Sequence, residues 1–300
     1  MKMKKVFLLS IGLLMAVSIF GQSIKVTPAL KKGMNKTYTN TTAITTMDQT
    51  INLKSDIQIS ITKETPEGFE MMMETTNFSS DAPEGNLAGR LVTISEEVLK
   101  DTKVQLRLNK EGKLLDIINY QEVKQKSLAT ISLMVDELFK TAPEISQVLK
   151  KETLVEQVSA TLTQENLIKS LGGNTNPLAL FGRTITNGMQ DQYNNGMVDL
   201  KRTWLVNGKK LYASAKADMN KEEMKTYILS QVEKLAPQQA DMIRENIDMV
   251  LSSGLVKIDV TENANYELAD DLWIKSMETS VSTETMGQKT SSNVKIQLKN

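Results

Sequence analysis

The sequence predicts an α+β fold, in which a large, curved antiparallel sheet, shaped like half a barrel, carries helices packed on one face. Several segments alternate apolar and polar residues with a period of two, which is typical of strands with one buried face. Short turns separate these segments, so neighbouring strands pair antiparallel. Two segments, about 121–171 and 221–251, change to the three-and-four-residue period of amphipathic helices and interrupt the strands as insertions.

The first strands form a predicted hairpin. A short segment, Ile24 to Leu30, and a Thr-rich stretch, Lys36 to Thr46, are separated by a turn at Lys32 and Gly33. From Ile51 to Thr62 every second residue is apolar, with Ser55 as the exception, and the turn at 65–68 leads into a strand over 69–78. The segment Asp81 to Gly89, which holds one proline and two glycines, predicts a loop.

Two further hairpins follow from turn residues. Val104 to Leu108 and Leu114 to Asn119 flank a turn that ends in Gly112, and the strands 197–206 and 209–217 flank Asn207-Gly208. Asn-Gly is a strong signal for a tight hairpin, because both of its residues tolerate positive φ. The chain closes on strands over about 255–262, 273–284 and 294–298, with connections expected at 263–265 and 286–288.

The predicted helices carry their own start and stop signals. Leu128, Ile131, Val135 and Leu138 repeat at helical spacing, and Thr141-Ala142-Pro143-Glu144 matches a capping box that would open a new helix. Gly172-Gly173-Asn174 would stop this helical region. In the second region Asn220, with Glu223 three residues later, is the expected start, and Pro237 predicts a break.

The first 22 residues have the plan of a secretory signal peptide. Three lysines precede an apolar run from Val6 to Phe20, and Gly21 and Gln22 supply a cleavage point. The run is shorter than the ~20 residues of a spanning helix. We therefore expect residues 23–300 to form one exported α+β domain, in the periplasm or outside the cell, with no transmembrane span after the leader is removed.

Composition excludes several functions. Removing the three leader lysines leaves 33 basic against 36 acidic side chains, a net charge of −3, which does not favour nucleic acid. The chain has no cysteine and no histidine, so disulfides, Ser-His-Asp triads, cysteine nucleophiles and imidazole or thiolate zinc sites are excluded. Carboxylate chemistry remains, but the adjacent acid pairs diverge on strands and helices. No acidic spacing matches a calcium loop, and we expect no enzyme, metal or cofactor.

Three stretches carry a family resemblance. They are an opening Leu30-Lys31-Lys32-Gly33 that runs to Tyr38, the hairpin Ile51 to Phe78, and Tyr266 to Ser276, where a Trp follows an acidic turn and a Lys-Ser pair follows the Trp. These stretches resemble uncharacterised exported proteins of Gram-negative bacteria. More distantly, long strands wrapped around helices resemble the half-barrel of periplasmic lipoprotein carriers. The resemblance implies a fold and no catalytic residues.

The expected function is hydrophobic ligand binding. Fourteen methionines follow the leader, and methionine adapts to ligands of varied shape. The candidate lining residues are aromatic or apolar residues of the strands and of the second helical region: Phe69, Met71, Met73, Trp204, Trp273, Met224 and Ile228. A lipid or a lipidated envelope protein is the expected partner. The alternative is a structural or protein-interaction module of the envelope whose sheet is filled by its own helices, with these residues as ordinary core.

Overall fold

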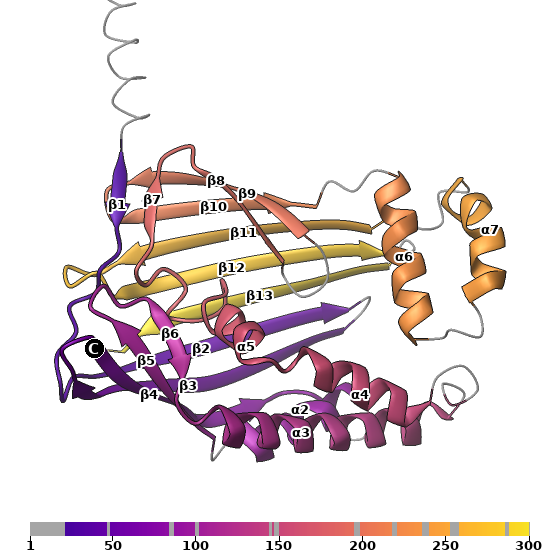
Figure 1. Cartoon of the computed structure of the whole chain (residues 1–300), viewed down its shortest axis with the longest axis horizontal. Coiled ribbons are helices and arrows are strands. Elements are labelled where there is room, and N and C mark those ends of the chain that lie inside the picture. Colours follow the sequence, from indigo (N-terminus) through magenta and orange to yellow (C-terminus); the bar gives the residue numbers. More distant parts are fainter. Residues whose placement is uncertain are drawn as a thin grey trace, which may run out of the picture.

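A computed structural model gives the structure of the chain and confirms an α+β fold built on a large antiparallel sheet (Figure 1). The described residues are 22–46, 49–83, 87–99, 102–143, 146, 150–194, 199–217, 221–235, 240–252, 258–285 and 288–299. The leader and its cleavage point, apart from Gln22, lie outside these residues, as do Asn220, Pro237 and the expected turn at 286–287.

Eleven strands form one open sheet. Their order is β6-β5-β4-β3-β2-β13-β12-β11-β10-β9-β8, and every neighbouring pair is antiparallel. The strands are β2 (Asn35–Thr46), β3 (Gln49–Glu64), β4 (Gly68–Ser80), β5 (Lys103–Asn109), β6 (Leu114–Ile117), β8 (Gln190–Asn194), β9 (Asp199–Asn207), β10 (Lys210–Lys216), β11 (Ile258–Leu268), β12 (Ile274–Thr285) and β13 (Gln288–Leu298). The three predicted hairpins are therefore confirmed.

Pairing of β2 with β13 joins the two halves of the sheet. Each half is a meander of consecutive strands, and β2 and β13 are the first and last strands of the large sheet along the chain. The register runs from Tyr38 opposite Leu298 to Thr46 opposite Thr290. A separate two-stranded sheet pairs β1 (Ser23–Lys25) with β7 (Thr184–Thr186).

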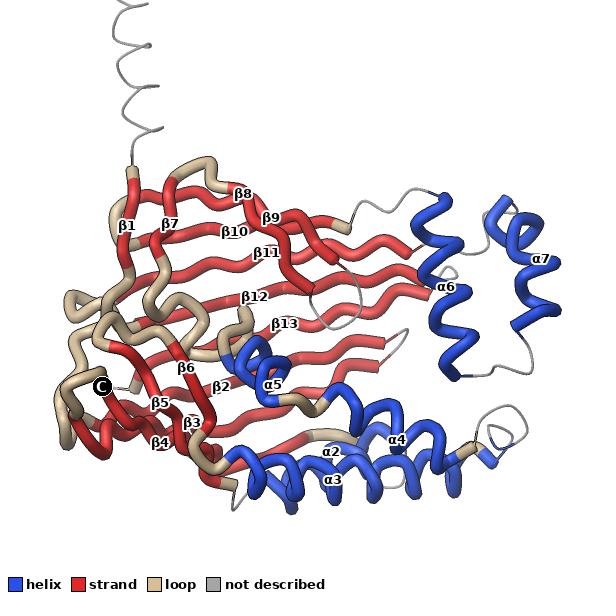
Figure 2. Tube along the Cα trace, in the orientation of Figure 1, coloured by secondary structure: helices blue, strands red, loops and turns tan. Residues whose placement is uncertain are grey.

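Helices lie in two groups (Figure 2). The first comprises α2 (Leu87–Leu99), α3 (Tyr120–Thr141), α4 (Lys151–Thr161) and α5 (Gln164–Leu171), and the second comprises α6 (Lys221–Leu235) and α7 (Ala240–Ser252). The second group lies beyond the ends of the long strands in Figure 1. We call this the helix end of the sheet, and the opposite end, with the turns at 65–67, 207–209 and 269–273, the turn end.

Two sequence predictions are wrong. The expected connection at 263–265 lies inside β11, because Asn263 and Asn265 point to the outer face while Glu262, Ala264 and Tyr266 continue the buried alternation. The polar pair thus marks the wet face of a strand rather than a turn. The expected loop at 81–89 is also shorter than predicted, since α2 begins at Leu87 and includes Gly89.

Most of the helix expected after the capping box at Thr141-Ala142-Pro143-Glu144 lies outside the described residues, and within it Pro143 and Ser146 have the 3-10 helical conformation. Thr141 is the last residue of α3, and its hydroxyl contacts Glu137 in the preceding turn. The next described helix, α4, begins at Lys151, while Glu144 lies outside the described residues. The stop at Gly172 is confirmed, because Gly172 is the C-cap of α5 and its backbone N–H donates to Ile168 O.

One hydrophobic core covers the inner face, which we define as the face carrying Tyr38, Ile57, Met71, Trp204 and Ile296. The core takes buried residues from β6 at one edge of the sheet through to β9 near the other. A smaller cluster of Leu200, Ala215, Ala217 and Val260 lies toward the helix end, with Tyr227 of α6 packed against it. The opposite, outer face is rich in Thr, Asn, Lys and Glu.

Candidate functional site

The turn end of the inner face is filled by the chain itself. Residues 174–183, which we call the plug, place Leu178, Ala179, Leu180 and Phe181 in the core with at most 5% exposure. The Phe181 ring meets the Trp273 ring edge-on, at a centroid distance of 5.0 Å. These buried apolar side chains fill the inner face at this end, as in a close-packed protein interior.

The N-terminal segment holds the plug in place. Val26, fully buried, donates its N–H to Arg183 O at 2.8 Å and accepts from Gly182 N at 2.9 Å. Gly182 has a φ of +70°, and an added Cβ would lie 2.6–2.9 Å from atoms of Lys113. Only glycine fits this close approach without displacement of the neighbouring backbone.

Most of the sequence-predicted site residues lie in the filled core. Met71, Met73, Trp204 and Trp273 are buried there, and Phe69 packs against the same cluster half-buried. The Trp273 indole N–H donates to Ala29 O at 3.0 Å. These five residues are therefore brought into one cluster, but they contact other core residues and the plug.

Met224 and Ile228 lie apart from this cluster. Both are on α6 at the helix end, where they are half-buried. The structure therefore divides the predicted site into a filled part at the turn end and a part on α6. This division depends on tertiary packing, so it could not be predicted from the spacing of residues along the chain.

Toward the helix end, the inner face is less completely covered. Cross-strand pairing places Met277, Ile296, Asn40 and Ser55 in one row, and Thr279, Val294, Thr42 and Leu53 in the next. The third row holds Val281, Ser292, Ile44 and Ile51. Exposure rises along β2 in the same direction, from 0% at Tyr38 to 36% at Ile44.

We call the incompletely buried residues of the last two rows the helix-end strip. It consists of Thr42, Ile44, Leu53, Val281 and Ser292. Its flanks differ, because Val281 and Tyr227 of α6 pack against the same small buried cluster, while Ile51 is buried at the β3 side. The strip is thus a stretch of apolar and hydroxyl-bearing sheet surface between two covered regions.

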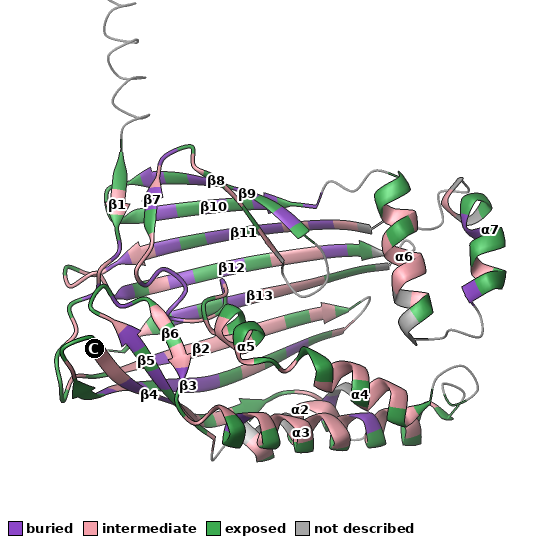
Figure 3. Ribbon diagram, in the orientation of Figure 1, coloured by how far each residue is buried: buried purple, intermediate pink, exposed green. Residues whose placement is uncertain are grey.

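The helices near the strip also keep apolar side chains half-exposed. None of the 11 residues of α4 is buried, and α3 has only Val123 and Val135 buried, while Leu133 is 48% exposed (Figure 3). Leu167, Ile168 and Leu171 of α5 pack on the inner-face core from outside without becoming buried. An amphipathic helix normally buries its apolar stripe, so these faces have capacity for further contact.

A buried polar network, not predicted from the sequence, lies beside the plug. Arg202, 5% exposed, donates from Nε and Nη2 to the two carboxylate oxygens of Asp191 at 2.8 and 2.7 Å. Its third nitrogen, Nη1, donates to Asn174 Oδ1 at 2.9 Å. The guanidinium also stacks on Tyr193 and Trp204, with centroid distances of 4.4 and 4.6 Å.

Asn174 connects this network to two other strands, β11 and β12. Its Oδ1 accepts from Tyr266 Oη at 2.9 Å, its Nδ2 donates to Glu262, and its backbone carbonyl accepts from Thr279 Oγ1 at 2.6 Å. Arg183 is a second cation on Asp191, with a hydrogen bond of 2.6 Å. Two cations and two anions balance, so the network anchors the start of the plug to the sheet.

The pKa shifts of Asp191 and Tyr193 agree with a network in which the charged groups have hydrogen-bond partners. Burial by itself raises the pKa of Asp191, but hydrogen bonds and charge from Arg202 and Arg183 outweigh it and hold that pKa below its usual value. Burial, followed by the hydrogen bond to Glu262, raises the pKa of Tyr193 far above its usual value. Asp191 is therefore ionised and Tyr193 neutral at neutral pH.

The sequence does contain a signal for this network. Arg202 alternates with Leu200 and Trp204, and Glu262 alternates with Val260 and Ala264, so both charges occupy positions of the buried face. A charge at an inward position of a strand requires a partner. Two inward-facing residues of opposite charge on strands of one sheet therefore indicate a buried polar network.

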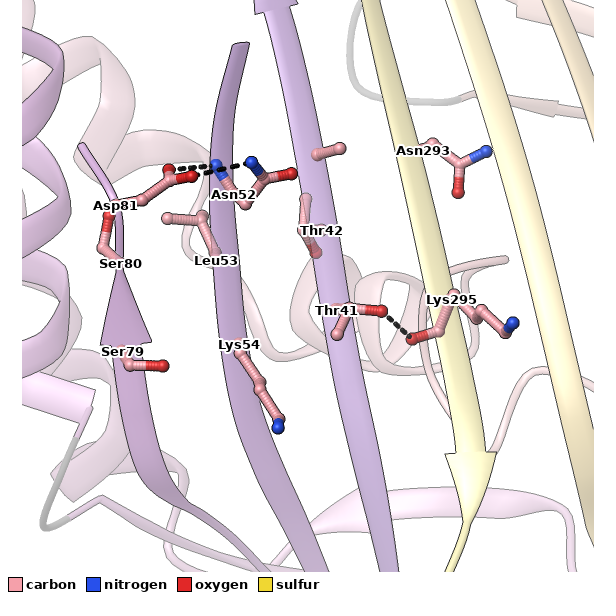
Figure 4. A pocket seen from close by; sticks show the side chains of 11 residues that line it. Thr41, Thr42, Asn52, Leu53, Lys54, Ser79, Ser80, Asp81, Asn293 and Lys295 are labelled. Atoms are coloured by element: carbon pink, nitrogen blue, oxygen red, sulfur yellow. Dashed lines mark hydrogen bonds between the residues drawn. The ribbon is translucent and has the colours of Figure 1, made fainter.

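A separate groove of about 500 Å³ opens on the outer face (Figure 4). Asp81 accepts from the backbone N and the side-chain Nδ2 of Asn52 at 2.6 and 2.7 Å, and these hydrogen bonds lower its pKa. Lys54 and Lys295 line the same groove. The groove is open to solvent and places these charged side chains beside apolar atoms, so it does not enclose the expected apolar ligand.

Comparisons with known proteins leave the function to be argued from the structure. No model of a known protein family matches the chain, and no curated protein matches it significantly. Within the part of the chain that the structure describes, no cluster of three or more acidic side chains could hold a metal ion. The described helices include none with both the length and the apolar character to cross a membrane.

Proposed function

We propose that this chain is a non-enzymatic, exported protein of the bacterial envelope that binds a hydrophobic ligand, or the lipid of a lipidated partner, over the helix-end strip. The observation that carries the proposal is the partial exposure of apolar inner-face residues at one end of a sheet whose other end is densely filled. Partly exposed apolar surface opposite helices is the arrangement expected of a site for an apolar guest.

The helices supply the second wall of the proposed site. Met224 and Ile228 of α6 are half-buried, as are many apolar residues of α3 and α4. A ligand between sheet and helices would remove both surfaces from water, with a gain of about 25 cal/mol for each Å² of apolar area. Half-buried methionine on α6 would adapt to the shape of the guest.

Export and curvature support the same proposal. The leader-like N-terminus favours a protein of the periplasm or the exterior, where lipids and lipoproteins need carriers. A single core that draws residues from β6 and from β9 favours a sheet bent around it, like the half-barrel of periplasmic lipoprotein carriers. The described part of the chain holds neither histidine nor a cleft with facing carboxylates, which favours a non-enzymatic role.

The alternative is a protein-interaction module of the envelope. Its supporting observation is α7, where Met242 and Met249 are 60% and 73% exposed and lie seven residues apart on one helix face. In that case the plug would complete the core, the strip would be covered without a ligand, and α7 would contact another envelope protein.

Native mass spectrometry with solvent extraction tests the proposal. The mature protein is purified from a Gram-negative periplasm without detergent, and its intact mass also reports whether the leader has been removed. We expect a reproducible additional mass that extracts as lipid. A bare polypeptide mass that is unchanged after incubation with mixed envelope lipids would contradict the proposal and direct the search to protein partners.

Two matched variants locate the ligand. Ile44→Trp places a bulky ring in the helix-end strip, and Leu205→Trp places the same ring on the outer face, where Leu205 is 54% exposed. We expect the lipid mass to disappear in the first variant and to persist in the second. Persistence in both variants would move the ligand away from the strip.

A further inference from the structure

A buried oxygen at the inner edge of the helix-end strip has no hydrogen-bond donor among the described residues. It is the amide oxygen Oδ1 of Asn40, in the row next to the strip. The amide nitrogen of the same side chain donates to Ser55 Oγ at 3.4 Å, and Ser55 is 3% exposed. A buried acceptor without a donor is unfavourable, and native proteins rarely keep one unless a water or a ligand supplies the missing group.

Tyr38 Oη, in the preceding row, is also unpartnered but belongs to a different environment. The Tyr38 side chain is fully buried in the filled core, and burial together with the charge of Asp271 at the turn end raises its pKa far above the usual value. Asn40 is only half-buried and adjoins the strip. Of these two oxygens, Asn40 Oδ1 is the one beside partly open surface.

The inner-face side chains nearest the strip supply no positive charge to neutralise an anion, and the one charged neighbour among the described residues directly opposite the strip, Glu262 opposite Val281, is itself acidic. From the row of Asn40 to the rim at Thr283 and Thr290, the described inner-face side chains of β12, β13, β2 and β3 are apolar, hydroxyl-bearing or amide-bearing. Lys54 and Lys295 lie on the outer face, where they line the groove of Figure 4. A carboxylate or phosphate held at Asn40 would therefore be buried without a counter-ion, which is unfavourable.

We infer that the strip binds an uncharged amphiphile, such as a long-chain alcohol or amide, whose polar end donates a hydrogen bond to Asn40 Oδ1. Its apolar chain extends past Thr42, Leu53 and Ile44 toward the helix end. Asn40 and Ile44 are four positions apart along β2, a distance of about 13 Å at the ~3.3 Å rise per residue of a strand. The inference rests on the proposed function and adds the class of ligand and its orientation.

Three probes of equal chain length, decanol, decanoate and decane, separate the contributions of the apolar chain, the hydrogen-bond donor and the negative charge. Affinities are obtained from the rise of Tm of the mature protein with probe concentration, because a ligand of the folded state stabilises it in proportion to ln(1 + [L]/Kd). We expect decanol to bind roughly tenfold more tightly than decane, and decanoate to bind most weakly. Equal binding of all three probes overturns the inference and leaves the proposed function intact, whereas binding of none contradicts both.

The variant Asn40→Leu removes the acceptor and keeps a similar volume. We expect decanol affinity to fall roughly tenfold, to the value for decane, while decane affinity stays unchanged. The matched control is Asn265→Leu on the exposed outer face of β11, which should leave all three affinities as in the wild type. An equal effect of the two variants on decanol binding overturns the inference.

A second variant protects the test against misfolding of the first. Asn40→Asp keeps acceptor oxygens at the same place and adds a negative charge when ionised. We expect decanol binding to persist and decanoate binding to fall below the wild-type level by about tenfold. Unchanged decanoate binding in a folded Asn40→Asp variant also overturns the inference, because the carboxylate of the probe would then lie elsewhere.

Discussion

The two ends of the inner face differ although the same strands build both. At the turn end, Tyr38, Trp273 and Leu180 are fully buried, and the plug and the N-terminal segment cover them. At the helix end, Ile44 is 36% exposed and Leu53 and Val281 are half-buried, and the helices α3 and α4 also keep apolar residues half-exposed. An alternating strand therefore determines which residues face inward, while the segment that covers them determines whether they form a core or a site.

The largest expected difference between the two ends is the loss of free energy of unfolding when a side chain of the inner face is truncated to alanine. Trp273→Ala removes a fully buried side chain that contacts Phe181 and donates to Ala29 O, so we expect a loss of about 3–5 kcal/mol in the free energy of unfolding. Ile44→Ala should cost about 1 kcal/mol or less, because its side chain is already partly hydrated. Urea denaturation of both variants measures the difference, and equal losses would mean that the strip is packed as densely as the turn end.

A somewhat smaller effect is expected from the anchor of the plug. Arg202→Met removes the two hydrogen bonds to Asp191 and the one to Asn174, and it leaves the half-buried Asp191 carboxylate with Arg183 and the Trp204 indole N–H. We expect a loss of about 3 kcal/mol. Lys201→Met, at the neighbouring exposed position, should change stability by less than about 0.5 kcal/mol. Limited proteolysis near the plug should accelerate only in the first variant.

The smallest expected effect is a pH dependence that belongs to the turn-end network. Arg202 and Arg183 depress the pKa of folded Asp191, so its contribution to stability is present above the ordinary pKa of 3.8 and disappears as pH falls through the lower folded value. Asp191→Asn should reduce the loss of stability below about pH 4, by about 1 kcal/mol across that window. Acid titrations followed by circular dichroism measure the slope, for which Ile44→Ala is the control. An unchanged slope in Asp191→Asn would show that the pair does not couple to folding.

Local signals predicted much of the sheet. The tight turn expected at Asn207-Gly208 forms one residue later, at Gly208 and Lys209, because Asn207 pairs with Lys210; Gly208 has a positive φ of 59°. The alternation at Ile51 to Thr62 separates the inner from the outer face of β3, but Asp56 on the outer face is buried, where Asn77 and Lys299 donate to its carboxylate. Predictions failed where one pattern served two structures: the asparagines at 263 and 265 resembled a turn, but they are the outward half of a long strand.

The candidate site was predictable only in part. Met71, Met73, Trp204 and Trp273 do gather in one place, as aromatic and apolar residues of inward parity should. Their separation from Met224 and Ile228 depends on where α6 packs, and α6 is joined to the sheet through segments with no strong spacing signal. The sequence places the charged residues Arg202 and Glu262 at inward positions of alternating strands, but their partners come from other strands and from Asn174.

The sequence by itself determined most long strands, the three hairpins, the helical regions 121–171 and 221–251, and the chemistry excluded by missing histidine and cysteine, because these depend on local periodicity, turn geometry and composition; α2, β7 and β8 were not predicted. Only the tertiary structure decided that β13 pairs with β2, that residues 174–183 fill one end of the inner face, and that Asn40 Oδ1 is left without a donor at the margin of the other. These features join residues far apart in the sequence, as when Leu298 pairs with Tyr38. Such contacts form only when the whole chain has closed upon itself, and no short window of sequence encodes them.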